Sequence, residues 1–137
     1  MAYLPNNDVA VLFDIDLNCS YNDGDIVGIC EDGKIRPFNF ESEIKPVEYI
    51  GVLSLNPQIL LGCWGTSEEN KLPVIIAGRK SCWVNGTKLS PGKKIVMDRN
   101  IGSFREYDSL FDREYNGIII SVEEENRDKS LCYILFK

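Results

Sequence analysis

The residues with the most suggestive chemistry are two carboxylates near the start of the chain. Residues 9–16 read VAVLFDID, so Asp14 and Asp16 stand in the Asp-x-Asp order of a phosphatase motif, whose first Asp attacks phosphorus. That motif continues with Gly-Thr and needs helices that connect parallel strands, whereas this chain continues with Leu17-Asn18 and lacks amphipathic helical patterns. We therefore interpret the two carboxylates as the polar face of a strand and assign no catalytic residue.

A wider set of oxygen-bearing side chains surrounds these carboxylates. Its members are Asp14, Asp16, Asn18, Asn22, Asp23 and Asp25. Calcium requires several ligands of this kind, but their spacing does not fit the EF-hand loop, and acidic turns are common on β proteins. We assign no metal and no cofactor to this set.

Thiol and imidazole chemistry is limited by composition. The chain has no histidine, and its five cysteines form no C-x-x-C pair, which excludes a cysteine-histidine zinc site. The cysteines are Cys19, Cys30, Cys63, Cys82 and Cys132. We expect them to be reduced and to pack as small hydrophobic residues.

Length and charge restrict the classes of partner. A chain of 137 residues suits one domain, and a net charge of −6 repels nucleic acid, so we expect no nucleic-acid partner. Apolar runs of about six residues are far shorter than a membrane span, and the first residues lack the pattern of a signal peptide. We expect a protein made in the cytoplasm with no membrane partner.

Short apolar runs separated by turn residues indicate the fold. Within residues 72–102, three strand-like runs alternate with the turn pairs Asn85-Gly86 and Pro91-Gly92. Similar spacing elsewhere predicts an all-β fold, a small sandwich or barrel of about eight to ten short antiparallel strands. We expect an N-terminal arm over residues 1–8, a single β domain over residues 9–137, and Trp83 in its core.

Two segments of the chain resemble one another. Gly24 precedes a strand, a hairpin and the closing run 49–54, and Gly92 precedes a similar series that closes with 115–121. This pattern predicts a duplicated strand-hairpin-strand unit. Within the second copy, a capping box at 103–106 and aromatic residues at helical spacing predict at most one short helix, or a turn, in 103–114.

Several motifs are similar to a β-rich module of phage fibre and virion-surface proteins. That module has a "GV(V/I)S-x-NP" segment followed by "PV-x-h-x-GR-x-x-V-x-V-x-G-x-h-x-x-GD-x-h", where h is apolar. The matching residues are Gly51 to Pro57, Leu60-Leu61-Gly62, Leu72 to Val74, Ala77-Gly78-Arg79, Val84-Asn85-Gly86 and Pro91-Gly92. The resemblance covers roughly residues 23 to 121. It departs at Lys93, where the family has the Asp of "GD", and at the insert 63–71.

The resemblance implies a non-catalytic structural component of a virus particle, such as a head fibre, capsid decoration or tail-fibre module. Proteins of this kind act through contacts with copies of themselves, most often as homotrimers, and with other virion proteins. A self-cleaving maturation domain and a carbohydrate-binding β-barrel are the alternatives, the first because some members lie beside an autoprocessing chaperone domain. We expect the partner contact to involve Tyr3, Leu4, Trp64, Phe104, Tyr107, Leu110 and Phe111.

Overall fold

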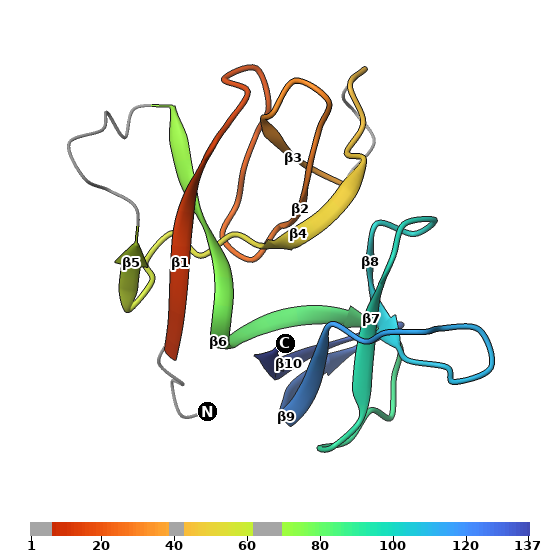
Figure 1. Ribbon diagram of the computed structural model, residues 1–137. Helices are drawn as coiled ribbons and strands as arrows, with labels where there is room; N and C mark the ends of the chain where they lie inside the picture. Colours follow the sequence, from red (N-terminus) through yellow and green to blue (C-terminus); the bar gives the residue numbers. More distant parts are fainter. Residues whose placement is uncertain (1–6, 39–42, 62–69) are drawn as a thin grey trace. The chain divides into compact units, whose positions relative to one another are not determined.

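The computed structural model describes residues 7–38, 43–61 and 70–137, and every regular element in these ranges is a β-strand (Figure 1). The strands are β1 (Asn7–Asp14), β2 (Ile26–Ile29), β3 (Ile35–Pro37), β4 (Glu48–Val52), β5 (Ile59–Leu61), β6 (Lys71–Asn85), β7 (Lys94–Asp98), β8 (Ser103–Glu106), β9 (Gly117–Asn126) and β10 (Lys129–Phe136). The predicted all-β fold is therefore confirmed. The segment 103–114 contains β8 and a turn, so of the two predicted forms the turn is the one that occurs.

The chain divides into two compact units. The N-terminal unit comprises residues 8–76, and the C-terminal unit comprises residues 77–137, to which Asn7 also belongs. Strand β6 passes through this boundary and contributes its first part to one unit and its second part to the other. The expected arm over 1–8 and single domain over 9–137 stay predictions; β1 begins at Asn7, inside the range of the expected arm.

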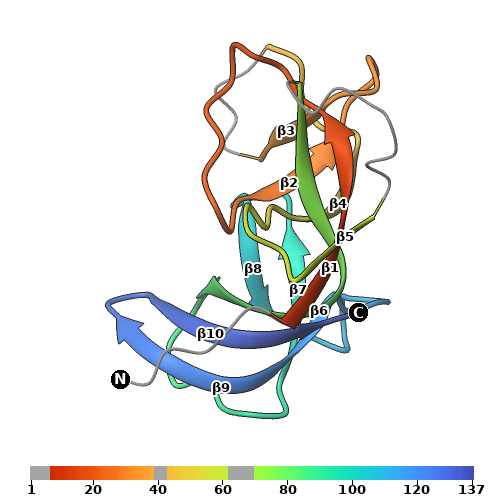
Figure 2. The ribbon, with the colours of Figure 1, turned by 90° about the vertical axis from the view of Figure 1, so that its left-hand side faces the viewer.

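The C-terminal unit is a closed five-stranded barrel. Its strands follow the order β6-β8-β7-β9-β10, and β10 pairs again with β6, which closes the sheet. The long antiparallel strands β9 and β10 lie side by side in Figure 2. Closure leaves no open sheet edge. The interior is filled by the buried side chains Cys82, Val84, Ile95, Phe104, Ile119, Cys132 and Ile134.

The N-terminal unit contains the three-stranded sheet β3-β2-β4 together with β1, β5 and the first part of β6. Strand β5 is parallel to β1 and lies at the edge of the other sheet, the one that contains β1 and β6. Two bridges, Ile15–Ile35 and Leu53–Val74, connect the three-stranded sheet to β1 and β6. Val27, Ile35, Leu53 and Val74 form the centre of the hydrophobic core.

The two units repeat the same hydrogen bonds. The Gly24 N–H donates to the Leu53 carbonyl at 2.9 Å, and the Gly92 N–H donates to the Ile119 carbonyl at 2.8 Å. Both glycines have positive φ angles, 87° and 90°, which explains why glycine stands at both places. The predicted duplication of a strand-hairpin-strand unit is confirmed by this shared register.

The repeat extends beyond the predicted segments to the strands that flank them. Ile15 pairs in parallel with Ile35, and Val84 pairs in parallel with Phe104 at the equivalent place. The antiparallel pairs Leu53–Val74 and Ile119–Ile134 also correspond. Strand β1 therefore corresponds to the second part of β6, and the first part of β6 corresponds to β10. In the same way β2, β3 and β4 correspond to β7, β8 and β9, so each unit contains five corresponding strands.

Trp83 does not belong to the core, so that prediction is wrong. Its side chain is 37% exposed, while its neighbours Cys82 and Val84 point into the barrel. A strand alternates its side chains between two faces, and with Cys82 and Val84 inside, Trp83 must face outward. The Lys129 ammonium lies 4.6 Å from the centroid of the indole ring.

Three of the described cysteines, Cys30, Cys82 and Cys132, are buried, and Cys19 is half-buried. All four are reduced, as expected, and Cys63 lies outside the described residues. In the same described part of the chain, no helix is long and apolar enough to cross a membrane.

Candidate interaction site

The loop that joins β8 to β9 is held in one conformation by its own hydrogen bonds. The Asp108 carboxylate accepts the Leu110 N–H at 2.9 Å, and the Asp108 carbonyl accepts the N–H groups of Phe111 and Asp112 at 3.1 and 2.8 Å. The Asp112 carboxylate in turn accepts the Asp108 N–H at 2.8 Å. Asp side chains readily form such local turns because their short carboxylate reaches the backbone two to four residues away.

Arg105 ties this turn to the barrel. Its guanidinium donates to both oxygens of Asp112 at 2.8 Å and, through Nε, to Asp98 on β7 at 2.8 Å. This hydrogen bond from Arg105, the largest effect, lowers the pKa of Asp112 to about 2. Both carboxylates are therefore ionised at neutral pH, and the fork geometry of the arginine fixes the loop against the strands.

Two tyrosines close the base of the loop. The rings of Tyr107 and Tyr115 meet edge to face with their centroids 6.2 Å apart, and the Tyr107 hydroxyl donates to the Asp112 carbonyl at 3.1 Å. The ammonium groups of Lys94 and Lys137 lie 4.7 and 4.4 Å from the centroid of the Tyr115 ring. The loop thus has a packed aromatic base. Its backbone projects from the barrel in Figure 1.

Leu110 and Phe111 form the apolar tip of this loop. Their side chains are 84% and 81% exposed, although the backbone around them is hydrogen-bonded. A single exposed hydrophobic residue is ordinary, but two adjacent bulky ones on an ordered, projecting turn resemble the anchors that fill a pocket in a partner. Because the loop is already ordered in the free chain, binding of a partner would not have to supply the entropy cost of ordering it.

The structure separates the predicted contact residues into three groups. Leu110 and Phe111 are exposed at the tip, and Tyr107 is half-buried at its base. Phe104 is 0% exposed, with its ring centroid 5.8 Å from that of Phe136, so it belongs to the barrel core and we remove it from the candidate surface. The other three, Tyr3, Leu4 and Trp64, lie outside the described residues.

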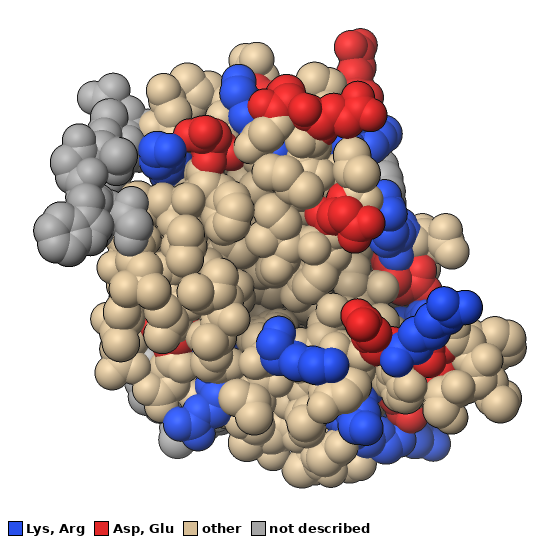
Figure 3. Space-filling model, viewed as in Figure 1, with Lys and Arg blue, Asp and Glu red and all other residues tan. Residues whose placement is uncertain are grey.

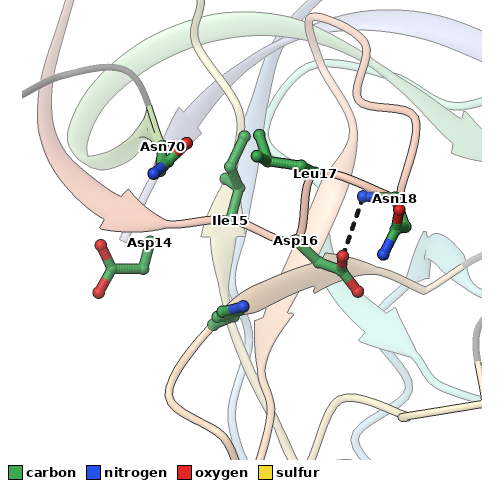
Figure 4. Close-up of a pocket in the computed structure, with 7 residues that line it drawn as sticks. Asp14, Ile15, Asp16, Leu17, Asn18 and Asn70 are labelled. Carbon is green, nitrogen blue, oxygen red and sulfur yellow. Dashed lines mark hydrogen bonds between the residues drawn. The ribbon is translucent and has the colours of Figure 1, made fainter.

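A hollow of about 490 Å³ beside the end of β1 is the second candidate site. Its lining is Asp14, Ile15, Asp16, Leu17, Asn18, Lys34 and Asn70 (Figure 4). The two carboxylates point in different directions, because β1 ends at Asp14 and the alternation of a strand does not continue to Asp16. The sequence-based expectation that they share one face is not met.

Each of these carboxylates is already engaged within the N-terminal unit. Asp14 pairs with Lys71 at 2.9 Å, and Asp16 accepts from the buried guanidinium of Arg36 at 2.9 and 3.1 Å. The hydrogen bond from the Asn18 N–H has the largest effect on the pKa of Asp16, which it lowers, and the hydrogen bond from Arg36 lowers it further. Across residues 7–38, 43–61 and 70–137, no group of three or more Asp, Glu, Cys or His side chains is arranged to hold a metal ion.

Charges of both signs are mixed on the surface. On the face drawn in Figure 3, Lys and Arg side chains lie next to Asp and Glu. The ion pairs Lys93–Glu106 and Lys71–Asp14 are examples of this mixing. A continuous basic surface, which a nucleic-acid backbone would require, is not seen on that face among the described residues.

Comparison with known proteins identifies structures with the same fold. No protein-family model matches the chain, and no curated protein matches it. The chain resembles the solved structure of pre-mature bacteriophage phi29 gene product 12, with a TM-score of 0.63 and 15% identity over 99% of this chain. It also resembles the C-terminal fragment of bacteriophage phi29 gene product 12, with a TM-score of 0.61 and 17% identity over 95% of this chain.

The two matches differ in how much of the other chain they cover. This chain spans 23% of the pre-mature gene product 12 and 100% of the C-terminal fragment. At such low identity, the likeness establishes a shared fold, and it does not transfer a function.

Proposed function

We propose that this chain is a non-catalytic structural component of a virus particle, such as a head fibre, capsid decoration or tail-fibre module, and that it acts through protein–protein contacts. The observation that carries this proposal is the apolar tip, two bulky side chains held in the open by an ordered turn. The fold that the chain shares with a bacteriophage gene product supports the same class of protein. The motifs around Gly51 and Leu72 support it independently.

The proposal makes this protein a homo-oligomer, most often a trimer in proteins that it resembles, attached to a larger assembly. It is made in the host cytoplasm and its place is the virion. The geometry favours contact over catalysis, because the most suggestive carboxylates, Asp14 and Asp16, are paired with Lys71 and Arg36. No ligand, nucleic-acid or membrane contact forms part of the proposal.

Self-cleavage, the alternative suggested by the resemblance, is tested by intact mass. We expect the purified chain to keep the mass of residues 1–137 after prolonged incubation. The appearance of two fragments whose masses add up to the whole would replace the structural role with a maturation role. The other alternative, a carbohydrate-binding β-barrel, is tested on a glycan array. Binding that is lost when an exposed aromatic ring is removed would favour a carbohydrate site.

The contact role is tested with one tip variant and one matched control. Leu110→Ser removes an 84% exposed side chain from the tip, and Ile101→Ser removes a 47% exposed side chain from the turn between β7 and β8. We expect the tip variant to lower both the mass measured by light scattering and the amount of chain in purified particles, while the control keeps both. Absence of the chain from particles, together with a mass of 15.5 kDa at high concentration, would refute the proposal.

A further inference from the structure

The C-terminal unit also carries a small apolar groove. It is lined by Tyr115, Ile118, Leu135, Phe136 and Lys137, with a volume of about 200 Å³. Leu135 and Ile118 are direct partners across β9 and β10, so the floor of the groove is a rigid part of the barrel wall. Leu135 is 44% exposed there, and the space suits one or two apolar side chains.

The rim of this groove is cationic. Lys94 and Lys137 both place their ammonium groups over the Tyr115 ring, at 4.7 and 4.4 Å from its centroid. Two positive charges held by one ring favour an occupant that brings negative charge with its apolar side chains.

The apolar tip has the matching character. Leu110 and Phe111 lie beside the exposed Asp108, and the exposed Arg113 and Glu114 follow; Asp112, on their other side, is already paired with Arg105. Asp108 is fixed by the N–H of Leu110, which places its carboxylate beside the apolar side chains. The tip thus offers two apolar side chains with the exposed carboxylates of Asp108 and Glu114 nearby, which the two lysines of the groove would attract.

The tip cannot reach the groove of its own molecule. Tyr115 lines the groove and pairs with Tyr107 at the base of the loop, while Arg105 holds Asp112 against the barrel. Folding the tip back would break these contacts, and the 81% exposure of Phe111 shows that it lies outside the groove. The occupant must therefore come from another molecule.

We propose that the apolar tip of one copy of this chain inserts into the groove of a second copy. The proposal rests on the homo-oligomer of the proposed function and names the surfaces of its contact. Tip and groove are different surfaces, so the contact is heterologous, and repeated addition closes a ring or continues as a fibre. An aromatic side chain buries roughly 150–250 Å², well below the ~800 Å² per partner of a standard interface, so the tip is the anchor of a wider contact.

A heterologous contact gives a signature in a mixing experiment with the full chain. Phe111→Ser removes the tip, and Leu135→Glu blocks the groove on a side chain that is 44% exposed. We expect the wild-type chain to assemble and each variant alone to sediment at 15.5 kDa. Their mixture should give a one-to-one dimer of twice that mass and nothing larger, since one intact tip and one intact groove remain.

Charge reversal provides a second measurement that leaves the barrel core untouched. Lys137→Glu and Glu114→Lys should each weaken self-association at least ten-fold, and the double variant should recover most of that loss. Assembly that is unchanged by all four single variants would overturn the tip-and-groove contact while leaving the structural role in place. A wild-type chain that stays at 15.5 kDa and is absent from particles would overturn both.

Discussion

Replacing Arg36 by Met and, in a separate variant, Arg105 by Met should show how burial sets the stability that an arginine gains from two carboxylates. The measured quantity is the loss in free energy of unfolding. Arg36 on β3 lies opposite Gly28, and Arg105 on β8 lies opposite Val96, so the two arginines occupy equivalent places in the two units. Each guanidinium bridges two carboxylates. Arg36 donates to Asp16 and Asp32, with distances of 2.8 to 3.1 Å.

The difference between the two sites lies in exposure. Arg36 is 2% exposed, and its partners Asp16 and Asp32 are 19% and 34% exposed. Removing one partner of a buried pair costs roughly 3–5 kcal/mol; because water reaches both partners here, we expect about 3 kcal/mol for Arg36→Met. Arg105 is itself 31% exposed, although its partners Asp98 and Asp112 are only 19% and 10% exposed. Because solvent reaches the guanidinium and screens its pairs, we expect the smaller cost, about 1–2 kcal/mol, for Arg105→Met.

The assay is urea unfolding of the full chain at pH 7, followed by circular dichroism. The two substitutions change the same atoms on the same backbone, so each is the control for the other. A triple variant, Arg36→Met with Asp16→Asn and Asp32→Asn, should regain part of the lost stability because no charge is left unpaired. Equal costs for Arg36→Met and Arg105→Met, or a cost under ~1 kcal/mol for Arg36→Met, would refute the argument from burial.

Four further outcomes follow from individual residues. Arg36 and Arg105 lower the pKa values of Asp32 and Asp112 to about 2, so their stabilisation should be complete above pH ~4 and be lost as the pH falls toward 2, seen as a falling melting temperature. A Cβ at position 117 would lie 2.7 Å from a methyl carbon of Ile134, so Gly117→Ala should lower the midpoint of urea unfolding. Burial leaves the Cys132 thiol 0% exposed and raises its pKa to about 11, so its alkylation at pH 8, measured by peptide mass spectrometry, should be at least ~100-fold slower than that of an ordinary thiol. Trp83→Ala should cost under ~2 kcal/mol in unfolding free energy, because the ring is 37% exposed; a loss of 3 kcal/mol or more would return it to the core.

The sequence predicted the parts of the fold that depend on local signals. Turn residues with positive φ, such as Gly24, Gly86 and Gly92, mark the ends of strands, so the all-β class and the repeat could be inferred from them. The aromatic spacing over 103–114 also suggested a helix. That signal misled because Phe104 packs inside the barrel as a strand residue, which depends on its long-range pairing with Val84.

The candidate site was predictable only in part. Leu110 and Phe111 were expected at a contact surface because their apolar side chains exceed what one core requires. The turn that presents them depends on Arg105, which reaches Asp98 and Asp112, seven residues away on either side. Such a bridge follows from the register of β7 and β8, which no local pattern in the sequence specifies.

The described residues of the two copies differ where the second and third strands of the repeat pack on an aromatic ring. In the N-terminal unit, a Cβ at Gly28 would lie 2.6 Å from the ring of Phe38, so the glycine leaves the space in which that buried ring packs. The equivalent place in the C-terminal unit holds Val96. The N–H of Tyr107 donates to the Lys94 carbonyl as that of Phe38 donates to Ile26, so the two rings are counterparts, and Tyr107 packs against Tyr115 at the base of the loop.

The two copies therefore differ at a glycine and at an aromatic ring, and in the C-terminal copy that ring belongs to the base of the apolar tip. The hydrogen bond between Gly24 and Leu53 in the N-terminal unit has its counterpart between Gly92 and Ile119 in the C-terminal unit. The loop over 107–116 is anchored by contacts of its own, such as that between Arg105 and Asp112. Features that the repeats share serve the fold that both units need. An anchored turn that exposes Leu110 and Phe111 adds nothing to the packing of its own unit, so it is where selection for a partner is expected to act.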